Sequence, residues 1–595
     1  MNPSVAFIRP LTVYAACGLA LALVCTIFAC NPPIEVPTDA LPSTCILTTG
    51  EITAMFHGGT ITKDGIVDAP NSLGFEGDTA EPPIDCPFYE WAEQAFLWVT
   101  SPAPAIYGKG ARVFESPVFY DVTPPDADGK RTLVPHAAGR IHVMAVRANK
   151  TGAHHLPIVF SKAGILLEYE EPPVSPNGKL LVANRSGQQI EVQDIKAGAT
   201  GRPVFVGKDG KAISGVRPIF RTPNPPTTIL QRFMVGRTPV FFDLFGDVVQ
   251  VETGQADDAV LITQGGSLVY YLVQVNDVFA YFRTGISHGQ INAGSFPFDD
   301  AGMQAIRTYA RANSRTLTDS DAMAVELKSS WVLASSVPDP ADYFTITAAV
   351  PHYNKTATQW TLVPNVLDTV QLAMVGMHVV GNVRGHGEMI WSTFIHTGVA
   401  PDTTYSYVNA HTTVTETANT NGTWLLCANG APPPYNQQRQ GFDFSTGNIV
   451  ATSGNTIGPS NIIAMKPWGA AADIQPNEFS GSSANANSEV IAANDAVFNA
   501  LIAGDLRKNY IFRGATWTLG GHAPTVPPAI GSSEISGDET GTTSMSNVTM
   551  ETFQQGNTSI WTGTTCFTCH QNANPAVGGA DTGVSHIFFA MKPLF

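Results

Sequence analysis

The chain has 595 residues, too many for one ordinary domain, and its 44 % of apolar residues can supply a large core. Charged residues make up only 14 %, and the 54 glycines and 43 prolines are typical of a turn-rich, strand-rich secreted protein. The formal net charge of −16 argues against nucleic-acid binding, which needs a basic surface, and is compatible with solubility or with steering of a basic partner.

The first 30 residues are organised like an export signal. Arg9 precedes an apolar run from Leu11 to Ala29, and polar, proline-rich sequence follows. The end of the run, IFAC, resembles a bacterial lipobox, in which Cys30 would be acylated and would tether the protein to a membrane. An uncleaved anchor and an ordinary secretory peptide are the alternatives. All three place the body outside the cytoplasm, in the periplasm or at the outer membrane.

Three cysteines remain once the signal segment and a C-terminal pair are set aside: Cys45, Cys86 and Cys427. In an oxidising compartment two of them can form a disulfide and leave one thiol. Cys45 and Cys86 are the nearer pair in the sequence, although spacing alone does not decide the connectivity.

The body, residues 31–519, is predicted to be an α+β fold that is predominantly β, a large antiparallel β-rich unit with a few helices. Apolar residues at helical spacing predict helices at 87–99, 299–313, 320–334 and 488–503, the last with Ser488 as its cap. Strand signals predict a hairpin at Asp209-Gly210, two β-rich runs in 258–282, and strands in 342–353, 368–383, 388–398 and 508–519.

The remaining stretches are predicted from their composition. Residues 430–485 are expected to be loops, and 520–546 are linker-like because they are poor in apolar residues. A short helix at 547–555 is expected to open the C-terminal segment. The chain therefore divides into a signal segment (1–30), the body (31–519), a linker-like segment (520–546) and a C-terminal segment of helix and loop (547–595).

The most specific motif is Cys566-Phe567-Thr568-Cys569-His570. Two thiols at this spacing can add to the vinyl groups of a haem while the adjacent histidine ligates the iron, so C-x-x-C-H predicts one covalent haem c. A structural disulfide, a redox thiol pair and half of a zinc site are the competing explanations for the cysteines. The chain has no second C-x-x-C for zinc and no βαβ pattern around the motif.

The second axial ligand of the iron is less defined, because few residues follow the motif. Met591 and His586 are candidates within the C-terminal segment, and His396 and His378 are candidates from the body. An open iron site is the further possibility. Each histidine can instead be structural, and Met591 can be a core side chain. So short a segment has too little core to bury a porphyrin alone, so we expect it to pack against the body.

The motif occurs together with the stretches EWAEQAFLWVT, GMHVVGNV, EMIWSTFIHT and SHIFFAMKPL. With them, the chain from about residue 85 to its end resembles a group of bacterial exported proteins identified only as cytochrome c family proteins. The resemblance implies a single c-type haem, held by Cys566, Cys569 and His570, and electron transfer with a redox protein partner. Many members have a glutamate where this chain has Ile395, so no role for that carboxylate is implied.

The sequence therefore predicts an exported monohaem c-type cytochrome that carries out one-electron transfer, and an electron carrier is favoured over an enzyme. The alternatives are a haem enzyme of a peroxidase or oxidase type with an open iron site, and a haem-containing sensory or binding protein. The sequence contains no P-loop and no H-E-x-x-H, which argues against the enzyme classes that use them.

Overall fold

The computed structural model describes the larger part of the chain, and all statements below concern that part. It covers residues 34–42, 45–77, 86–126, 130–137, 141–146, 156, 158–160, 166–197, 203–235, 238–249, 260–292, 294–443, 446–469, 483–523, 539–553, 555, 566–570 and 581–595. The predicted signal segment, with Cys30, lies outside these residues, as do residues 524–538 of the linker-like stretch.

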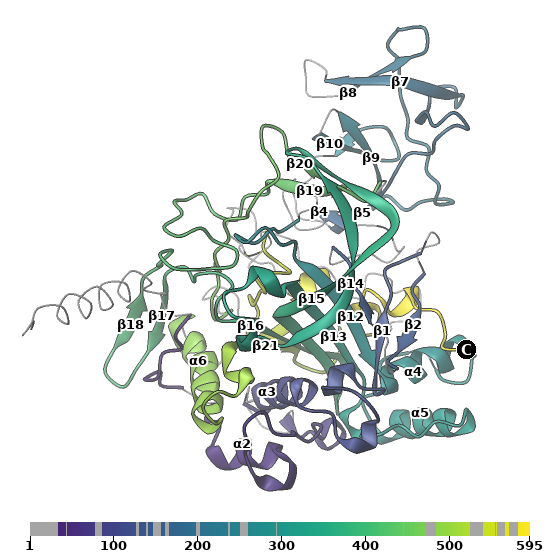
Figure 1. Cartoon of the computed structure of the whole chain (residues 1–595). Helices are drawn as coiled ribbons and strands as arrows, with labels where there is room; N and C mark the ends of the chain where they lie inside the picture. Colours follow the sequence, from purple (N-terminus) through teal and green to yellow (C-terminus); the bar gives the residue numbers. More distant parts are fainter. Residues whose placement is uncertain are drawn as a thin grey trace, which may run out of the picture.

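A large sheet forms the centre of the described part of the chain (Figure 1). Its main path runs in the order β2-β1-β12-β13-β15-β16-β21-β22, and every neighbouring pair on this path is antiparallel. The strands of this path are β1 (Phe119–Val122), β2 (Leu133–Pro135), β12 (Tyr270–Asn276), β13 (Val325–Leu333), β15 (Gln359–Val383), β16 (His386–His396), β21 (Tyr510–Thr518) and β22 (Glu539–Gly541). The fold is thus α+β and predominantly β, as predicted.

Four further strands extend this sheet. They are β3 (His142–Val143), β14 (Thr345–Lys355), β19 (Gln440–Asp443) and β20 (Asn448–Ala451). β14 forms a long antiparallel hairpin with β15, and β3 adds to β14 in parallel. β20 pairs with the start of β15 and with β19. The sheet therefore joins segments that are hundreds of residues apart in the sequence.

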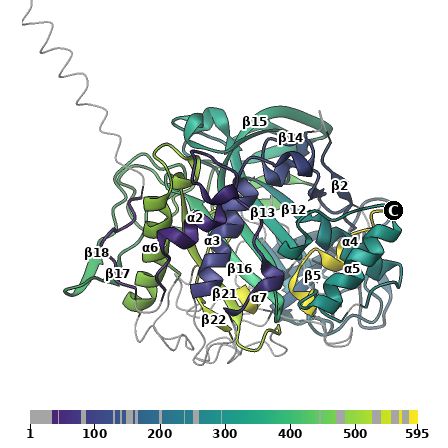
Figure 2. The same cartoon turned by 90° about the horizontal axis from the view of Figure 1, so that it is seen from below.

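One face of the sheet is covered by helices (Figure 2). These are α2 (Thr49–Met55), α3 (Cys86–Thr100) and α6 (Ser483–Ala500), whose apolar side chains share one core cluster with Leu327, Val379 and Ile390 of the sheet. A Cβ on Gly381 of β15 would lie 2.9 Å from the Trp91 ring of α3, so glycine permits this close packing. Among the described helices, none combines the length and the apolar character that a membrane span requires.

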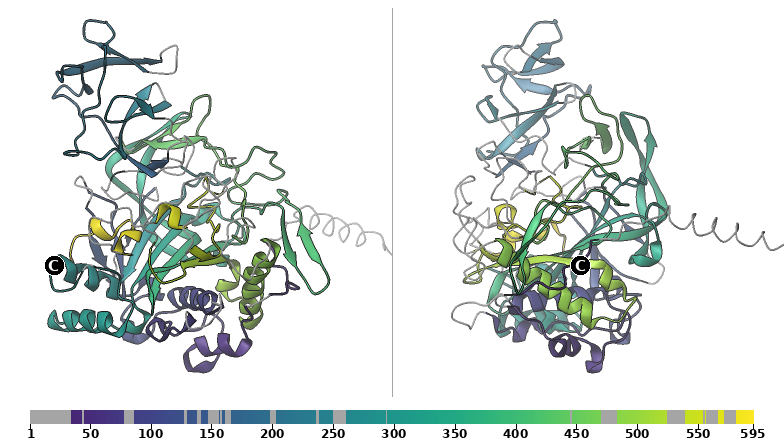
Figure 3. Two further views of the ribbon diagram at one scale, coloured as in Figure 1. Left: turned by 180° about the vertical axis from the view of Figure 1, so that it is seen from behind. Right: turned by 90° about the vertical axis from the view of Figure 1, so that its left-hand side faces the viewer.

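The opposite face carries α4 (Asp277–Ser287), α5 (Asp300–Ala312) and the C-terminal residues 581–595 (Figure 3). Side chains alternate between the two faces of a strand. Val275, Val380 and Trp391 therefore point to this second side, where they join a separate apolar cluster with Phe588 and Met591. The C-terminal segment is thus packed on the body, in agreement with the expectation from its length.

Two smaller sheets project from this body as an arm (Figures 1 and 3). One consists of β4 (Ile158–Phe160), β5 (Leu166–Glu170), β9 (Ile229–Val235), β10 (Thr238–Phe242) and β11 (Val248–Val249). The other consists of β6 (Leu181–Ala183), β7 (Gln189–Ala197) and β8 (Pro203–Gly207). Their apolar side chains form two small clusters, one of which contains residues of both sheets. A separate hairpin, β17 (Tyr405–Val408) and β18 (Thr413–Glu416), packs beside α6.

Several predicted elements are confirmed. The helices expected at 87–99 and 299–313 are α3 and α5, and the strands expected at 342–353, 368–383, 388–398 and 508–519 are β14, β15, β16 and β21. The turn predicted at Asp209-Gly210 is present, with Gly210 at φ 74°. Cys45 and Cys86 form a disulfide, and among the described cysteines Cys427 is a buried thiol outside it.

Other predicted elements were wrong. Residues 320–334 form a 3₁₀ turn followed by β13, not a helix, because alternate side chains of β13 face the two sides of the sheet. The second β-rich run of 258–282 ends at Asn276, whose side chain accepts the N–H of Phe279 and begins α4. Ser488 lies inside α6, where its Oγ donates to Ala484 O, so it is not the cap.

Three predictions for the C-terminal part of the chain were also wrong. Residues 548–553 form turns instead of the predicted short helix. Residues 539–541 of the linker-like stretch form β22, which pairs with β21 and is buried. The loops expected at 430–485 contain the short strands β19 and β20. In each case pairing with a distant strand or cover by the sheet decides the local structure, and local composition does not contain that information.

Candidate functional site

The C-x-x-C-H motif lies on the second face of the sheet. Cys566–Cys569 form one helical turn, α7, and His570 N donates to Cys566 O at 2.8 Å. Phe567 is 1 % exposed and belongs to the apolar cluster of that face, against which Cys566 packs. The side chains of Thr568 and Cys569 lie outside the described residues. The motif is therefore anchored by its phenylalanine between the sheet and the C-terminal residues.

His570 is held by a backbone carbonyl. Its Nδ1 lies 2.8 Å from Val584 O. A carbonyl oxygen only accepts hydrogen bonds, so Nδ1 carries the proton and donates it. In the neutral ring the lone pair is then on Nε2. Metal-ligating histidines are commonly oriented in this way, with the second ring nitrogen donating to a carbonyl or a carboxylate.

Two rings contact the His570 imidazole. The Trp391 ring of β16 lies with its centroid 4.0 Å away at an interplanar angle of 39°, and the His586 ring is stacked at 4.0 Å and 14°. The structure thus brings His586, one of the four candidate second ligands, directly beside His570. Face-to-face stacking places both imidazoles on one side of any metal that His570 would bind, whereas a second axial ligand approaches from the opposite side.

Met591 lies in the same apolar cluster as Phe567 and Val584, and it is 1 % exposed. Its backbone is fixed twice, because Met591 N donates to Ile587 O at 3.1 Å and the residue forms a bridge with Arg131. The thioether is therefore buried in the apolar cluster that also contains Phe567, and the Met591 backbone lies beside Arg131 at the β2 edge of the sheet. Apolar surroundings suit a soft, neutral ligand.

His378 lies on the second face close to the motif. It sits on β15 opposite Thr393 of β16, one cross-strand row from the pair formed by Val380 and Trp391. Its Nε2 is 3.1 Å from Glu551 Oε2, a carboxylate of the C-terminal segment. Glu551 Oε2 also accepts the N–H of Asn547 at 3.0 Å. The pair therefore joins the body to the C-terminal segment beside the motif.

His396 is in different surroundings. It ends β16 and stacks on Tyr343 at 3.8 Å, in the core beneath α3. Gly398 N donates to its Nδ1 at 3.1 Å, and its Nε2 lies 3.3 Å from Asp342 O, so both ring nitrogens have backbone partners. Burial lowers the pKa of His396 to about 3. The structure therefore gives His396 a packing role, about 17 Å along the strand from Trp391.

A buried carboxyl group lies beneath the C-terminal residues. Glu326 of β13 accepts a hydrogen bond from Ser585 Oγ at 2.7 Å, and burial raises its pKa to about 7. Arg131 is also buried, which lowers its pKa to about 10 against the opposing charge of Glu326. Sequence reasoning missed Trp391 and Glu326, because the pairing of distant strands sets their distance from the motif.

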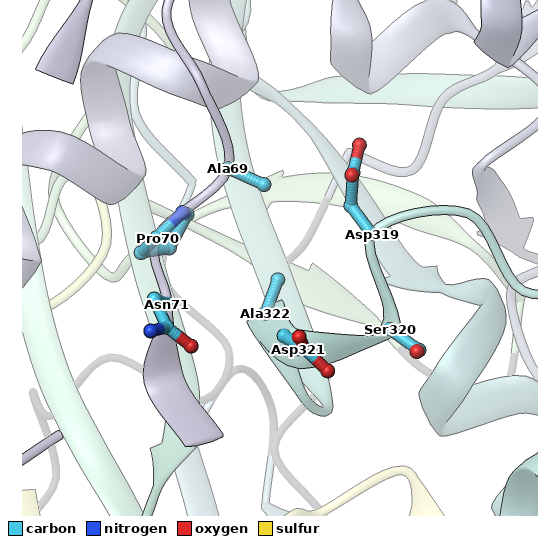
Figure 4. Close-up of a pocket in the computed structure, with 7 residues that line it drawn as sticks. All are labelled: Ala69, Pro70, Asn71, Asp319, Ser320, Asp321 and Ala322. Atoms are coloured by element: carbon cyan, nitrogen blue, oxygen red, sulfur yellow. The ribbon is translucent and has the colours of Figure 1, made fainter. Parts of the chain in front are cut away.

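A surface pocket lies elsewhere in the described structure (Figure 4). Ala69, Pro70 and Asn71 face the turn Asp319–Ala322 across it. Its lining offers two carboxylates and small side chains, without a base or thiol beside them. The residues that line the pocket include no histidine, lysine or cysteine.

Comparison with known proteins gives no match for this chain. No protein-family model, no curated protein and no solved structure matches it.

Proposed function

We propose that the chain is an exported monohaem c-type cytochrome that transfers single electrons to or from a redox protein partner. Cys566 and Cys569 form the thioether bonds to the haem, and His570 is the axial ligand. The hydrogen bond from His570 Nδ1 to Val584 O is the observation that carries this proposal, since it leaves the lone pair on Nε2. The C-x-x-C-H spacing supplies the attachment chemistry.

The residues around His570 fit a haem in two respects. Phe567, Trp391 and Val584 supply apolar side chains at the motif, as one face of a porphyrin needs. The donor atoms are a histidine nitrogen and, for the second axial position, a thioether or a further imidazole. A bound haem c would supply a reversible one-electron couple at its iron, and the protein would adjust the potential through burial and nearby charge.

For the second axial position we propose Met591. Met591 is buried in the apolar cluster that also contains Phe567 of the motif. The His586 ring, in contrast, is stacked on the His570 ring, so it would lie on the same side of the iron as His570. We do not propose His396 as the second axial ligand, because both of its ring nitrogens are hydrogen-bonded to backbone groups.

The paired His378 and Glu551 favour a second candidate function. A histidine oriented by a carboxylate can move protons, as a haem enzyme of a peroxidase type requires beside an open iron site. Such a protein would show high-spin iron that binds carbon monoxide or cyanide readily. An electron carrier with two protein ligands would show a low-spin spectrum with a sharp α-band on reduction.

Export is part of the proposal and has separate support. The segment 1–30 has the pattern of a signal, with Cys30 as a possible site of lipid attachment to a membrane. The Cys45–Cys86 disulfide is the kind of bond that persists in oxidising compartments such as the periplasm. The net charge of −16 favours a partner with a basic docking face, so electron transfer should slow at high salt.

The proposal is tested by producing the protein together with a c-type haem assembly system. Covalent haem is measured by the intact mass and by haem staining after denaturation. We expect one haem in the wild type and loss of covalent haem in the double variant Cys566→Ser/Cys569→Ser. Cys427→Ser is the matched control, since it removes a buried thiol outside the motif and should keep the haem.

Three outcomes would contradict all or part of the proposal. If the wild-type protein carries no covalent haem, the two cysteines of the motif form a disulfide or act as thiols instead. A haem that survives in the double variant would place the attachment elsewhere. A covalent haem with a high-spin, carbon-monoxide-sensitive spectrum would retain the attachment and replace electron transfer by the enzymatic alternative.

A further inference from the structure

A second group of ligand-type side chains lies far from the motif, near the other end of the sheet. Asp121 belongs to β1, His136 follows β2 directly, and His142 begins β3. His136 Nε2 lies 2.7 Å from Asp121 Oδ1, and His142 Nδ1 lies 2.8 Å from Asp121 Oδ2. One potential ligand atom from each residue lies within 4.8 Å of the other two. The three side chains are 8 to 12 % exposed, so an ion could reach them from solvent.

The protonation of His136 creates a conflict within this group. His136 Nδ1 lies 3.1 Å from Ser116 O and must donate to it, because a carbonyl only accepts. In the neutral ring, Nε2 then points its lone pair at a carboxylate oxygen 2.7 Å away. Two acceptors at that distance repel each other unless a cation or a second proton lies between them. A metal ion bound to both atoms removes the conflict.

The carboxylate is held in place from the neighbouring strand. Gln274 of β12 pairs in register with Asp121, is 0 % exposed, and donates from Nε2 to Asp121 Oδ1 at 3.0 Å and to Phe114 O at 2.8 Å. Partners of this kind orient metal ligands in known sites. Gln274 thereby fixes the carboxylate on which the two imidazoles converge. An ionised carboxylate is the form that binds metal.

Two other His–Asp pairs show what is special about this group. His57 with Asp68, and His352 with Asp368, have the same 2.8 Å separation between nitrogen and oxygen. Each is a single pair on the exposed surface, with side chains 39 to 72 % accessible. Asp121 differs because two imidazoles converge on one buried carboxylate. The exposed pairs are therefore natural controls.

We infer that Asp121, His136 and His142 bind one divalent first-row transition-metal ion. Two imidazoles and one carboxylate suit Zn²⁺, Fe²⁺ or Co²⁺, whereas Mg²⁺ and Ca²⁺ prefer oxygen ligands alone. Three protein ligands leave at least one coordination position for water or a small ligand. The ion would also join β1, the end of β2 and β3, three segments that meet at this part of the sheet.

This site is independent of the proposed haem. Asp121 alternates with Tyr120 and Val122, which face the C-terminal segment, so it faces the other side of the sheet. The path from β1 to β16, where Trp391 contacts His570, crosses four strand spacings, or about 19 Å. Loss of the haem would therefore leave the metal ligands in place.

The test uses the full-length protein without a polyhistidine tag, freed of metal by a chelator and dialysis. Zn²⁺ binding is followed by calorimetry and Co²⁺ binding by its visible absorption, so that haem iron does not interfere. We expect one equivalent of either ion in the wild type. Gln274→Met should weaken binding by about 10–100-fold, as for other residues that orient a ligand. Asp121→Asn and His142→Ala should weaken it further, whereas His352→Gln should bind as the wild type does.

Unfolding temperatures of the metal-free proteins show whether each variant folds. If a variant does not fold, the unfolding temperature of the wild type is measured with and without excess Zn²⁺ instead. We expect this temperature to rise with Zn²⁺, because an ion that binds only the folded state stabilises that state. No bound equivalent in the wild type, or equal binding in Asp121→Asn, would overturn the inference. The group would then be a hydrogen-bonded cluster in which His136 carries a second proton.

Discussion

Replacing Glu326 by glutamine is expected to remove a pH dependence from the reduction potential of the attached haem. Burial raises the pKa of Glu326 to about 7, against the hydrogen bond from Ser585 and the charges of Lys328 and Arg131. The carboxyl therefore loses its proton within the physiological range of pH. Its negative charge stabilises the oxidised haem, which carries one more positive charge, so the potential should fall as pH rises through 7.

The size of this effect follows from the register of the sheet. Glu326 pairs with Val380, which pairs with Trp391, and the Trp391 ring contacts His570. Two strand spacings place Glu326 about 10 Å from Trp391, whose ring contacts His570 of the motif. At an effective dielectric constant of about 20, two unit charges at that separation interact by about 1.7 kcal/mol. For one electron this is about 70 mV. The positive charges of Lys328 and Arg131 reduce it, so about 70 mV is an upper value.

The assay is a spectroelectrochemical titration of the wild type and Glu326→Gln between about pH 5 and pH 9, a range that spans the titration of the group. The wild-type potential should fall by several tens of millivolts across pH 7, and the variant potential should stay nearly level. Glu93→Gln is the control, since Glu93 is a buried carboxyl of α3 on the opposite face of the sheet. A wild-type potential that ignores pH, or a variant that keeps the full slope, would refute the reasoning.

The other predictions concern stability and ligation. Burial raises the pKa of Glu93 to about 8 from 4.5, so the folded state holds a proton that the unfolded state releases, and this group lowers stability as pH rises above 4.5. Glu93→Gln should therefore raise the free energy of unfolding by about 3 kcal/mol at pH 7 and leave it unchanged near pH 4, as measured by denaturant titration at both pH values; equal effects at the two would contradict this. The Cys45–Cys86 disulfide closes a sequence separation of 41, so the double serine variant should lose about 4 kcal/mol in the same assay, and a loss below about 1 kcal/mol would show that the unfolded chain is already constrained there. In the absorption spectrum of the oxidised haem protein, Met591→Leu should abolish the weak long-wavelength band of methionine ligation, whereas His396→Gln should keep it. A band that persists in Met591→Leu would show that Met591 is not the second axial ligand.

The comparison of α3 and β13 shows which elements local sequence could predict. The helix at 86–100 carries its apolar residues at helical spacing and is flanked by proline-containing sequence, so its pattern is complete within the segment. β13 is a central strand whose Glu326, Lys328 and Ser330 alternate with more apolar residues, and its partners lie about 50 residues away on either side. The local pattern of such a segment, with both charged and small residues, resembles that of a helix. Only its pairing with the two neighbouring strands shows that it is a strand.

The candidate site divides in the same way. The spacing of Cys566, Cys569 and His570 is a local covalent property, and it predicts haem attachment without any knowledge of the fold. The carbonyl that orients His570 comes from Val584, and the ring beside it comes from Trp391, which only the folded sheet brings near. Among the four candidate second ligands, sequence alone could not separate a buried thioether from a histidine bound by backbone groups.

The sequence by itself determined the β-rich composition, the export-type N-terminus and the C-x-x-C-H motif, because each of these depends on neighbouring residues alone. Only the tertiary structure decided that Glu326 lies under the C-terminal segment, and that Asp121, His136 and His142 converge at β1 to β3. The physical reason is that register between strands, not spacing along the chain, sets which polar groups share a buried environment. Burial in turn sets their pKa values and the ligands they can hold.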